Sequence, residues 1–129
     1  MDLMTILGLG IDVVEINRFK KIKNNKKLIK RIFTSHEKRY CENKNKALCF
    51  AKRFAAKEAF VKALGIGFRD GINLLNIEIK NNKLGMPSIL ISKFLKKKIM
   101  KKFKLKKFKV FLSISDEKNY AIANVIITK

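Results

Sequence analysis

The chain has 129 residues, of which 47% are hydrophobic and 32% are charged, and its formal net charge at pH 7 is +21. This composition predicts one globular domain over residues 1–129 and excludes a disordered chain, and no apolar run reaches the ~20 residues that a membrane-spanning helix requires. The charge predicts an acidic partner, but lysine is so abundant that a bias of an AT-rich genome accounts for much of it, so charge alone does not choose between nucleic acid, anionic lipid, phosphates and an acidic protein.

The amino-terminal segment, residues 1–12, lacks the basic start of a signal peptide, and we expect a cytoplasmic protein. Residues 4–14 form an almost continuous apolar run rich in β-branched residues, which predicts a buried strand. Asp12 and Glu15 close the run, so a carboxylate emerges where the buried backbone meets the surface. Gly8 and Gly10 lack the third glycine of a dinucleotide-binding fingerprint and indicate close packing of the strand instead.

A basic helical stretch follows over residues 17–33, with a possible break at Asn24 and Asn25. Thr34 or Ser35 can cap a short helix from residue 37 or 38 to residue 42, and residues 43–47 form a polar connection. Cys41 and Cys49 have no CxxC spacing and only one histidine to join them. We therefore expect neither a zinc site nor a disulfide scaffold, and we expect both thiols to be reduced.

Residues 48–64 form the longest predicted helix, and Gly65 stands where a helix commonly ends. A glycine-rich loop over residues 65–71 comes next, followed by two short strands within residues 72–92, separated by a turn at 81–82 and an LGMP turn at 84–87. Residues 92–103 predict a basic amphipathic helix, and residues 107–115 and 119–128 predict a hairpin. The order of these elements predicts an α+β domain with a small antiparallel sheet packed against helices.

Glu58 lies in the middle of the longest predicted helix, and two roles for its carboxylate remain open. The first is a surface ion pair with Lys62, four residues further on. The second depends on that helix packing against the first strand, which would bring Glu58 close to Asp12. Two carboxylates with room for water and a phosphate suit Mg²⁺, Lys62 would face the same phosphate, and the fork of Arg53 suits a second one.

Two segments together are similar to one protein family. GLGIDVVEINR at residues 8–18 and KRFAAKEAFVKALGIG at residues 52–67 resemble the bacterial holo-acyl-carrier-protein synthases, which are small phosphopantetheinyl transferases. The resemblance continues through GINLLNIEI, the LGMP turn and SISDEKNYAIANVII, and so covers almost the whole chain. It implies transfer of the 4′-phosphopantetheine arm of coenzyme A to a serine of apo acyl carrier protein, with release of 3′,5′-ADP, in fatty acid biosynthesis.

The same resemblance implies roles for individual residues. Asp12 and Glu58 become the ligands of Mg²⁺, and Lys62 lies against the pyrophosphate. Glu58 is the best-placed base for the serine proton, either directly or through a water molecule. Arg53, Phe54 and the Gly65 loop become part of the coenzyme A pocket.

For the partner protein, the resemblance implies an acidic carrier protein gripped by Arg18, with Lys21 assisting through electrostatic steering. It also implies a homotrimer with active sites at the subunit boundaries, for which the carboxy-terminal hairpin would supply an interface. Two positions depart from the family pattern: Asp116 follows SIS where many members have histidine, and Met86 replaces a common lysine.

Two other classes of function remain as alternatives for the basic segment 93–109: a nucleic-acid-binding module and a membrane-surface helix. Against the first, the chain has no RNP-type motif and no helix-turn-helix signature. Neither alternative accounts for the motif at residues 53–65. We therefore expect no nucleic acid partner and no membrane insertion.

Overall fold

The structure is a computed structural model that describes residues 4–69 and 71–129. Residues 1–3 and 70 lie outside the described part, so the expectation for the amino-terminal segment and that for the loop 65–71 are followed only over the remaining residues. The elements in chain order are β1 (Ile6–Glu15), α1 (Ile16–Ile22), α2 (Lys26–Ile32), α3 (Ser35–Cys41), α4 (Lys46–Leu64), η1 (Leu74–Asn76), β2 (Ile77–Asn81), β3 (Pro87–Ile91), α5 (Lys93–Phe103), β4 (Lys109–Asp116) and β5 (Tyr120–Thr128).

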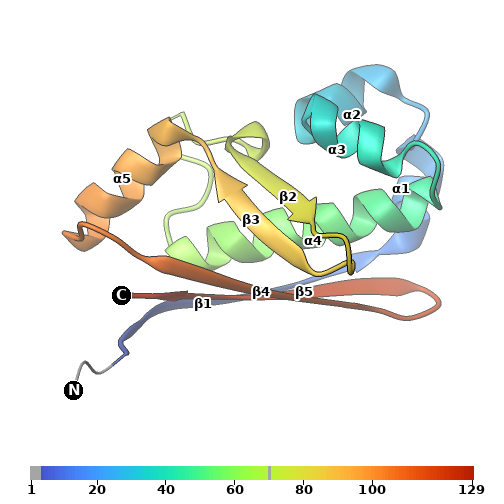
Figure 1. The fold of residues 1–129 in the computed structure, drawn as a ribbon. Helices are drawn as coiled ribbons and strands as arrows, with labels where there is room; N and C mark the ends of the chain where they lie inside the picture. Colours follow the sequence, from blue (N-terminus) through green and yellow to red (C-terminus); the bar gives the residue numbers. More distant parts are fainter. Residues whose placement is uncertain (1–3, 70) are drawn as a thin grey trace.

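The two sheets lie on opposite sides of the long helix α4. One sheet has the strand order β1-β5-β4, and the other is the antiparallel pair β2-β3. Both neighbours of β5 run antiparallel to it. Figure 1 shows α4 lying across the three-stranded sheet, with α1, α2 and α3 gathered at one end of the molecule and α5 at the other. The expected α+β class with a small antiparallel sheet is confirmed.

The packing of α4 on β1 depends on glycine. A Cβ atom built on Gly8 would lie 1.9 Å from the carbonyl oxygen of Ala63, and one built on Gly10 would lie 1.9 Å from that of Ala59. No side chain fits at such a distance, so strand and helix meet backbone to backbone. The expectation that these glycines serve close packing is confirmed.

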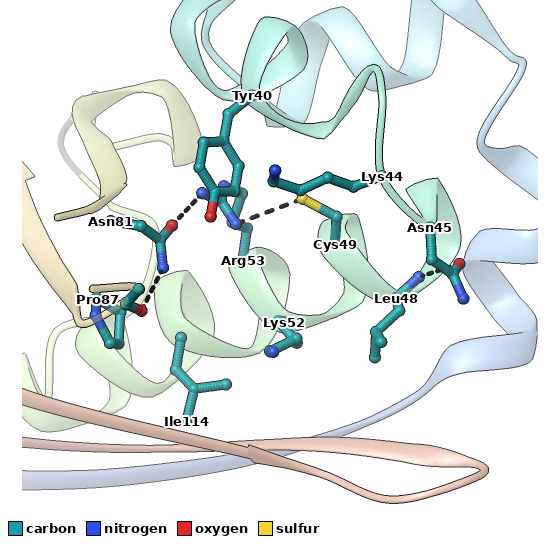
Figure 2. Close-up of a pocket in the computed structure, with 11 residues that line it drawn as sticks. Tyr40, Lys44, Asn45, Leu48, Cys49, Lys52, Arg53, Asn81, Pro87 and Ile114 are labelled. Carbon is teal, nitrogen blue, oxygen red and sulfur yellow. Dashed lines mark hydrogen bonds between the residues drawn. The ribbon is translucent and has the colours of Figure 1, made fainter. Parts of the chain in front are cut away.

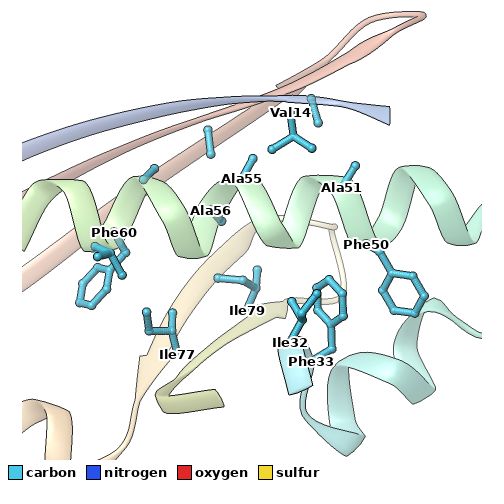
Figure 3. Close-up of a cluster of buried hydrophobic side chains, with 14 of the residues drawn as sticks. Val14, Ile32, Phe33, Phe50, Ala51, Ala55, Ala56, Phe60, Ile77 and Ile79 are labelled. Atoms are coloured by element: carbon cyan, nitrogen blue, oxygen red, sulfur yellow. The ribbon is translucent and has the colours of Figure 1, made fainter. Parts of the chain in front are cut away.

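The core fills both sides of α4. Figure 3 shows Ala51 and Ala55 of the helix near Val14 of the sheet, while Phe60 points to the opposite side, where Ile77 and Ile79 lie. These side chains are all buried. A helix buried on both sides lacks the single apolar stripe of a surface helix, which is why small alanines and large aromatics alternate around it.

The element boundaries follow the expectations with small differences. The break at Asn24 and Asn25 separates α1 from α2, and the Asn25 side chain caps α2 by accepting from the Leu28 amide. Helix α3 begins earlier than expected because Thr34 and Glu37 form a capping box at its start. Helix α4 begins at residue 46 rather than 48, because Asn45 caps it.

The expectation of unpaired thiols is wrong. Cys41 and Cys49 form a disulfide, with their Cα atoms 5.7 Å apart. The physical reason is the tight connection over residues 42–45, which folds the last turn of α3 back against the first turn of α4 and brings the two sulfur atoms within bonding distance. One bridge between adjacent helices requires no CxxC spacing, so the spacing rule did not exclude it.

Candidate functional site

Asp12 lies between strand β1 and helix α4. Side chains alternate along a strand, so Gly8, Gly10 and Asp12 all face the helix. The two glycines let the helix approach closely, and the next position on that face presents a carboxylate with 15% of its side chain exposed. The Nζ atom of Lys62 donates to Asp12 Oδ1 at 3.1 Å and to the carbonyl oxygen of Ile11 at 3.0 Å.

Glu58 lies one helical turn before Lys62 and close to the same carboxylate. Burial raises the pKa of Glu58, the negative charge of Asp12 raises it further, and the positive charges of Lys62 and Arg18 act in the opposite direction. The surface pair between Glu58 and Lys62 is not formed, since Lys62 bridges to Asp12 instead. Two carboxylates and a lysine therefore share one site, which lies between two elements far apart in the sequence.

Arg18 and Phe54 border this site. The guanidinium carbon of Arg18 lies 5.5 Å from the centre of the Phe54 ring, a cation–π contact, and Phe54 stands one turn before Glu58 on α4. Arg18 and Lys21 are both exposed and lie three residues apart on α1, so they share one face of that helix. Both side chains are therefore available to a partner that approaches near the carboxylates.

Arg53 does not lie at the site of Asp12, Glu58 and Lys62. It stands five positions before Glu58, which places its side chain about 140° away around the axis of α4. It is 4% exposed. The expected grouping of Arg53 with Lys62 on neighbouring phosphates is not found within the single chain, because the turn of the helix places the two side chains on different faces.

Arg53 lines a cavity of about 210 Å³, shown in Figure 2. Its guanidinium lies 4.2 Å from the centre of the Tyr40 ring, and Nη2 donates to Asn81 Oδ1. Its Nε atom is buried and has no hydrogen-bond partner among the residues that the structure describes. Lys44 and Lys52 also line the cavity, Lys52 being paired with Asp116 at 3.2 Å, and no acidic side chain of residues 4–69 and 71–129 lines it. Burial lowers the pKa of Arg53, because the charged guanidinium is costly to bury. An anion bound in the cavity would offset this cost.

Gly65 ends α4 in a left-handed conformation with φ of 73°, which favours glycine. A side chain at this position would lie 3.6 Å from Nζ of Lys102, whose ammonium donates to the carbonyl oxygen of Leu64. The carboxyl end of α4 is therefore capped by a cation from α5, and Gly65 lies apart from the Arg53 cavity.

Lys57 was missed in the sequence, although it belongs to the same helical motif. It is fully buried and forms an ion pair with Glu37 at 2.6 Å. Glu37 also accepts from the Ile79 amide at 3.0 Å, and the pair thus joins α3, α4 and β2. A lysine between apolar neighbours in a helix that is buried on both sides is the signal that could have indicated a buried partner. The lining residues Tyr40 and Lys44 had no such signal.

Two further observations concern the described residues. Within residues 4–69 and 71–129, no cluster of three or more His, Cys, Asp or Glu side chains is placed to bind a metal ion. No helix in the same ranges has the length and apolar character to cross a bilayer.

Comparison with known proteins gives matches along almost the whole chain. The family model of the 4′-phosphopantetheinyl transferase superfamily matches residues 8–125. A curated relative, the holo-[acyl-carrier-protein] synthase of Pelagibacter ubique, is 48% identical over 127 residues, which cover 98% of this chain and 99% of the relative. The crystal structure of holo-[acyl-carrier-protein] synthase from Neisseria meningitidis is 34% identical, with a TM-score of 0.84 and coverage of 97% and 100%. The holo-(acyl-carrier-protein) synthase structure from Bacillus anthracis, in complex with CoA (3′,5′-ADP), is 33% identical with a TM-score of 0.78 and covers 98% of each chain.

Proposed function

The chain belongs to the 4′-phosphopantetheinyl transferase superfamily, and from this premise we propose that it transfers the 4′-phosphopantetheine arm of coenzyme A to a serine of apo acyl carrier protein, as a step towards fatty acid biosynthesis. The products are holo acyl carrier protein and 3′,5′-ADP. The single observation that carries the proposal is the cluster of Asp12, Glu58 and Lys62 at the contact of β1 and α4, in a chain similar to named holo-[acyl-carrier-protein] synthases over almost its full length.

Asp12 and Glu58 would hold Mg²⁺. The fit rests on their chemistry: Mg²⁺ prefers oxygen ligands and is commonly bound through one or two carboxylates together with substrate phosphates. The rise that Asp12 causes in the pKa of Glu58 reflects two like charges close together, which a cation would relieve. When bound, the ion would neutralise charge on the phosphates of coenzyme A.

Glu58 and Lys62 would act on the reacting groups. A carboxylate whose pKa is raised by burial is a better proton acceptor than an exposed one, so Glu58 is suited to take the proton of the serine hydroxyl. Lys62, now bridged to Asp12, would turn its ammonium towards the pyrophosphate and stabilise the negative charge that develops on the leaving phosphate.

The cavity beside Arg53 would take an anionic part of coenzyme A. Three basic side chains and an unpartnered guanidinium nitrogen favour a phosphate there. This cavity and the Asp12–Glu58 site lie on different faces of α4, so one coenzyme A molecule would be held best by halves that come from neighbouring copies of the chain.

The outer face of the three-stranded sheet supports such an assembly. Leu9, Ile11 and Val13 project from β1 with 64%, 57% and 55% of their surface exposed, and Phe111 projects from β4 with 47% exposed. Apolar residues that lie together on a sheet face indicate an interaction surface. A homotrimer that buries this face is therefore part of the proposal.

The acidic carrier protein would dock on α1, where Arg18 and Lys21 are exposed beside the carboxylate site. A net charge of +21 speeds the encounter with an acidic partner at low salt. Arg18, which lies over Phe54, presents a fork that can bind a carboxylate through two hydrogen bonds.

The test is incubation with coenzyme A, Mg²⁺ and apo acyl carrier protein, followed by intact mass measurement of the carrier protein. We expect the mass of the phosphopantetheine arm to be added, and added only when all three components are present. Asp12→Asn should abolish the addition, while Glu117→Gln, at an exposed acid in the β4–β5 turn, should keep it. No mass gain with the unaltered chain, or full activity of Asp12→Asn, would refute the proposal.

A further inference from the structure

The disulfide forms part of the wall of the Arg53 cavity. Cys49 lines the cavity and is 7% exposed, whereas Cys41 is fully buried behind it. The Arg53 Nη1 atom donates to Cys49 Sγ at 3.5 Å, a contact drawn in Figure 2. One of the two sulfur atoms is thus reached through the cavity and lies against a cation.

The bridge also holds the rim of the cavity in place. It closes a segment of eight residues in sequence separation, and within that segment lie the lining residues Lys44, Asn45 and Leu48. Tyr40 directly precedes Cys41, and its ring makes two cation–π contacts. The guanidinium carbon of Arg53 lies 4.2 Å from the ring centre, and Nζ of Lys44 lies 4.5 Å from it. Two of the three cavity cations are therefore stacked on a residue that the bridge ties to α4.

We propose that Cys41 and Cys49 form a reversible thiol–disulfide switch that sets the affinity of this cavity for its anionic ligand. The identity of the ligand as coenzyme A rests on the proposed function, whereas the control of the rim by the bridge does not. Cytosolic disulfides, where they occur, are usually transient and catalytic or redox-sensing, so in a chain that we expect to be cytoplasmic this bridge points to a role beyond static stabilisation.

The exchange proceeds through Cys49. In the reduced protein, Cys49, whose sulfur lies against the guanidinium of Arg53, attacks as a thiolate a low-molecular-weight disulfide in the cavity and releases one thiol. The thiolate of Cys41 then attacks the sulfur of Cys49 and releases the second thiol. Two protein thiols lose two electrons and two protons, and one small disulfide is reduced to two thiols. Reduction follows the same path in reverse.

The oxidised form should bind more tightly. With the bridge closed, Tyr40 and Lys44 are already ordered around the cavity, so less side-chain freedom is lost when an anion enters. With the bridge open, the connection between α3 and α4 moves more freely. The entropy lost when Tyr40 and Lys44 become ordered then reduces the free energy of binding. At ~0.5–1.5 kcal/mol for each immobilised side chain, we expect the affinity to fall about tenfold on reduction.

The experiment measures the dissociation constant of coenzyme A by calorimetry for two forms of the same protein. One form is oxidised with oxidised glutathione and the other is reduced with a phosphine, and intact mass after alkylation verifies each state. Cys41→Ser is the matched variant, because it prevents the bridge while leaving the cavity lining unchanged. We expect the dissociation constant of coenzyme A for the unaltered chain to rise about tenfold on reduction. Cys41→Ser should bind coenzyme A like the reduced form under both conditions.

A second measurement does not depend on coenzyme A. Amide hydrogen exchange over residues 42–48 should speed up on reduction in the free protein, and inorganic pyrophosphate should lose affinity in parallel. If coenzyme A binds neither form while exchange and pyrophosphate respond, the proposed function fails and the switch stands. Equal affinities and equal exchange in both forms, or a bridge that does not form in any glutathione buffer, would overturn the switch itself.

Discussion

Replacement of Lys57 by methionine should destabilise the protein more than any change at its surface. The Nζ atom of Lys57 donates to Glu37 Oε1 at 2.6 Å, to the carbonyl oxygen of Ile32 at 2.7 Å and to that of Leu74 at 3.0 Å. Methionine fills nearly the same volume, so the packing of α4 is retained. What the change removes is the positive charge beside a fully buried carboxylate.

The size of the effect follows from the Glu37 carboxylate, which stays buried without its ion-pair partner. Breaking a buried ion pair by removing one partner costs about 3–5 kcal/mol, because the remaining charge stays buried without compensation. A domain of this kind has a total stability of about 5–15 kcal/mol. With a denaturant slope of ~2 kcal/mol per molar urea, a loss of about 4 kcal/mol lowers the unfolding midpoint by roughly 2 M.

Urea unfolding followed by circular dichroism measures this loss, and a second variant separates charge from packing. Adding Glu37→Gln to Lys57→Met removes the stranded charge, so the double variant should be more stable than Lys57→Met alone. The explanation by a buried unpaired charge is wrong if Lys57→Met costs less than about 1 kcal/mol, or if the two substitutions destabilise additively.

Four further changes test the carboxylate site and the docking surface. Lys62→Ala should lower turnover by a factor that corresponds to ~2–4 kcal/mol, the typical loss for a preorganised charge donor, and unchanged turnover with unchanged affinity for coenzyme A would leave it a mere ion-pair partner. Glu58→Gln should stabilise the metal-free protein at about pH 7 but not at about pH 4. Because the pKa of Glu58 is raised, the folded state keeps the proton to higher pH than the unfolded state, and the free energy of unfolding falls as pH rises from the unfolded-state pKa to the folded-state pKa. Urea unfolding at both pH values measures this difference. Gly10→Ala should cost about 1–3 kcal/mol in the same unfolding assay and reduce transfer, because its Cβ would collide with the backbone of α4; a stable, active variant would contradict the close contact. Arg18→Lys should weaken binding of apo carrier protein more than Lys98→Gln does, and equal losses in titrations at two salt concentrations would mean that diffuse charge recruits the partner.

Local signals in the sequence were enough for most of the fold. The apolar run before Asp12 and the glycine after residue 64 predicted β1 and the end of α4, because periodicity and backbone conformation act over a few residues. The start of α4 was missed, since asparagine at position 45 reads equally well as a loop residue or as a cap.

The carboxylate site was partly predictable because it needs only one tertiary contact. Once α4 packs on β1, Asp12 and Glu58 must lie near each other, and the two glycines indicated close packing of the strand, although not which element packs on it. The Arg53 cavity was not predictable in the same way. Its lining comes from α3, α4, β2, β3 and β4, from the connection between α3 and α4 and from the turn before β3, and no spacing in the sequence indicates how these segments meet. The same reason hid the bridge between Cys41 and Cys49.

The exposed apolar face of the β1-β5-β4 sheet has a consequence for how activity is measured. If copies of the chain cover this face and complete each other's sites, the active fraction obeys mass action and depends on total protein concentration. Dilution to the low concentrations of an enzyme assay would then separate the copies, and specific activity would fall on dilution and recover on concentration. A charged residue in place of Leu9, which is 64% exposed, would shift that dependence to higher concentration without touching either half of the site.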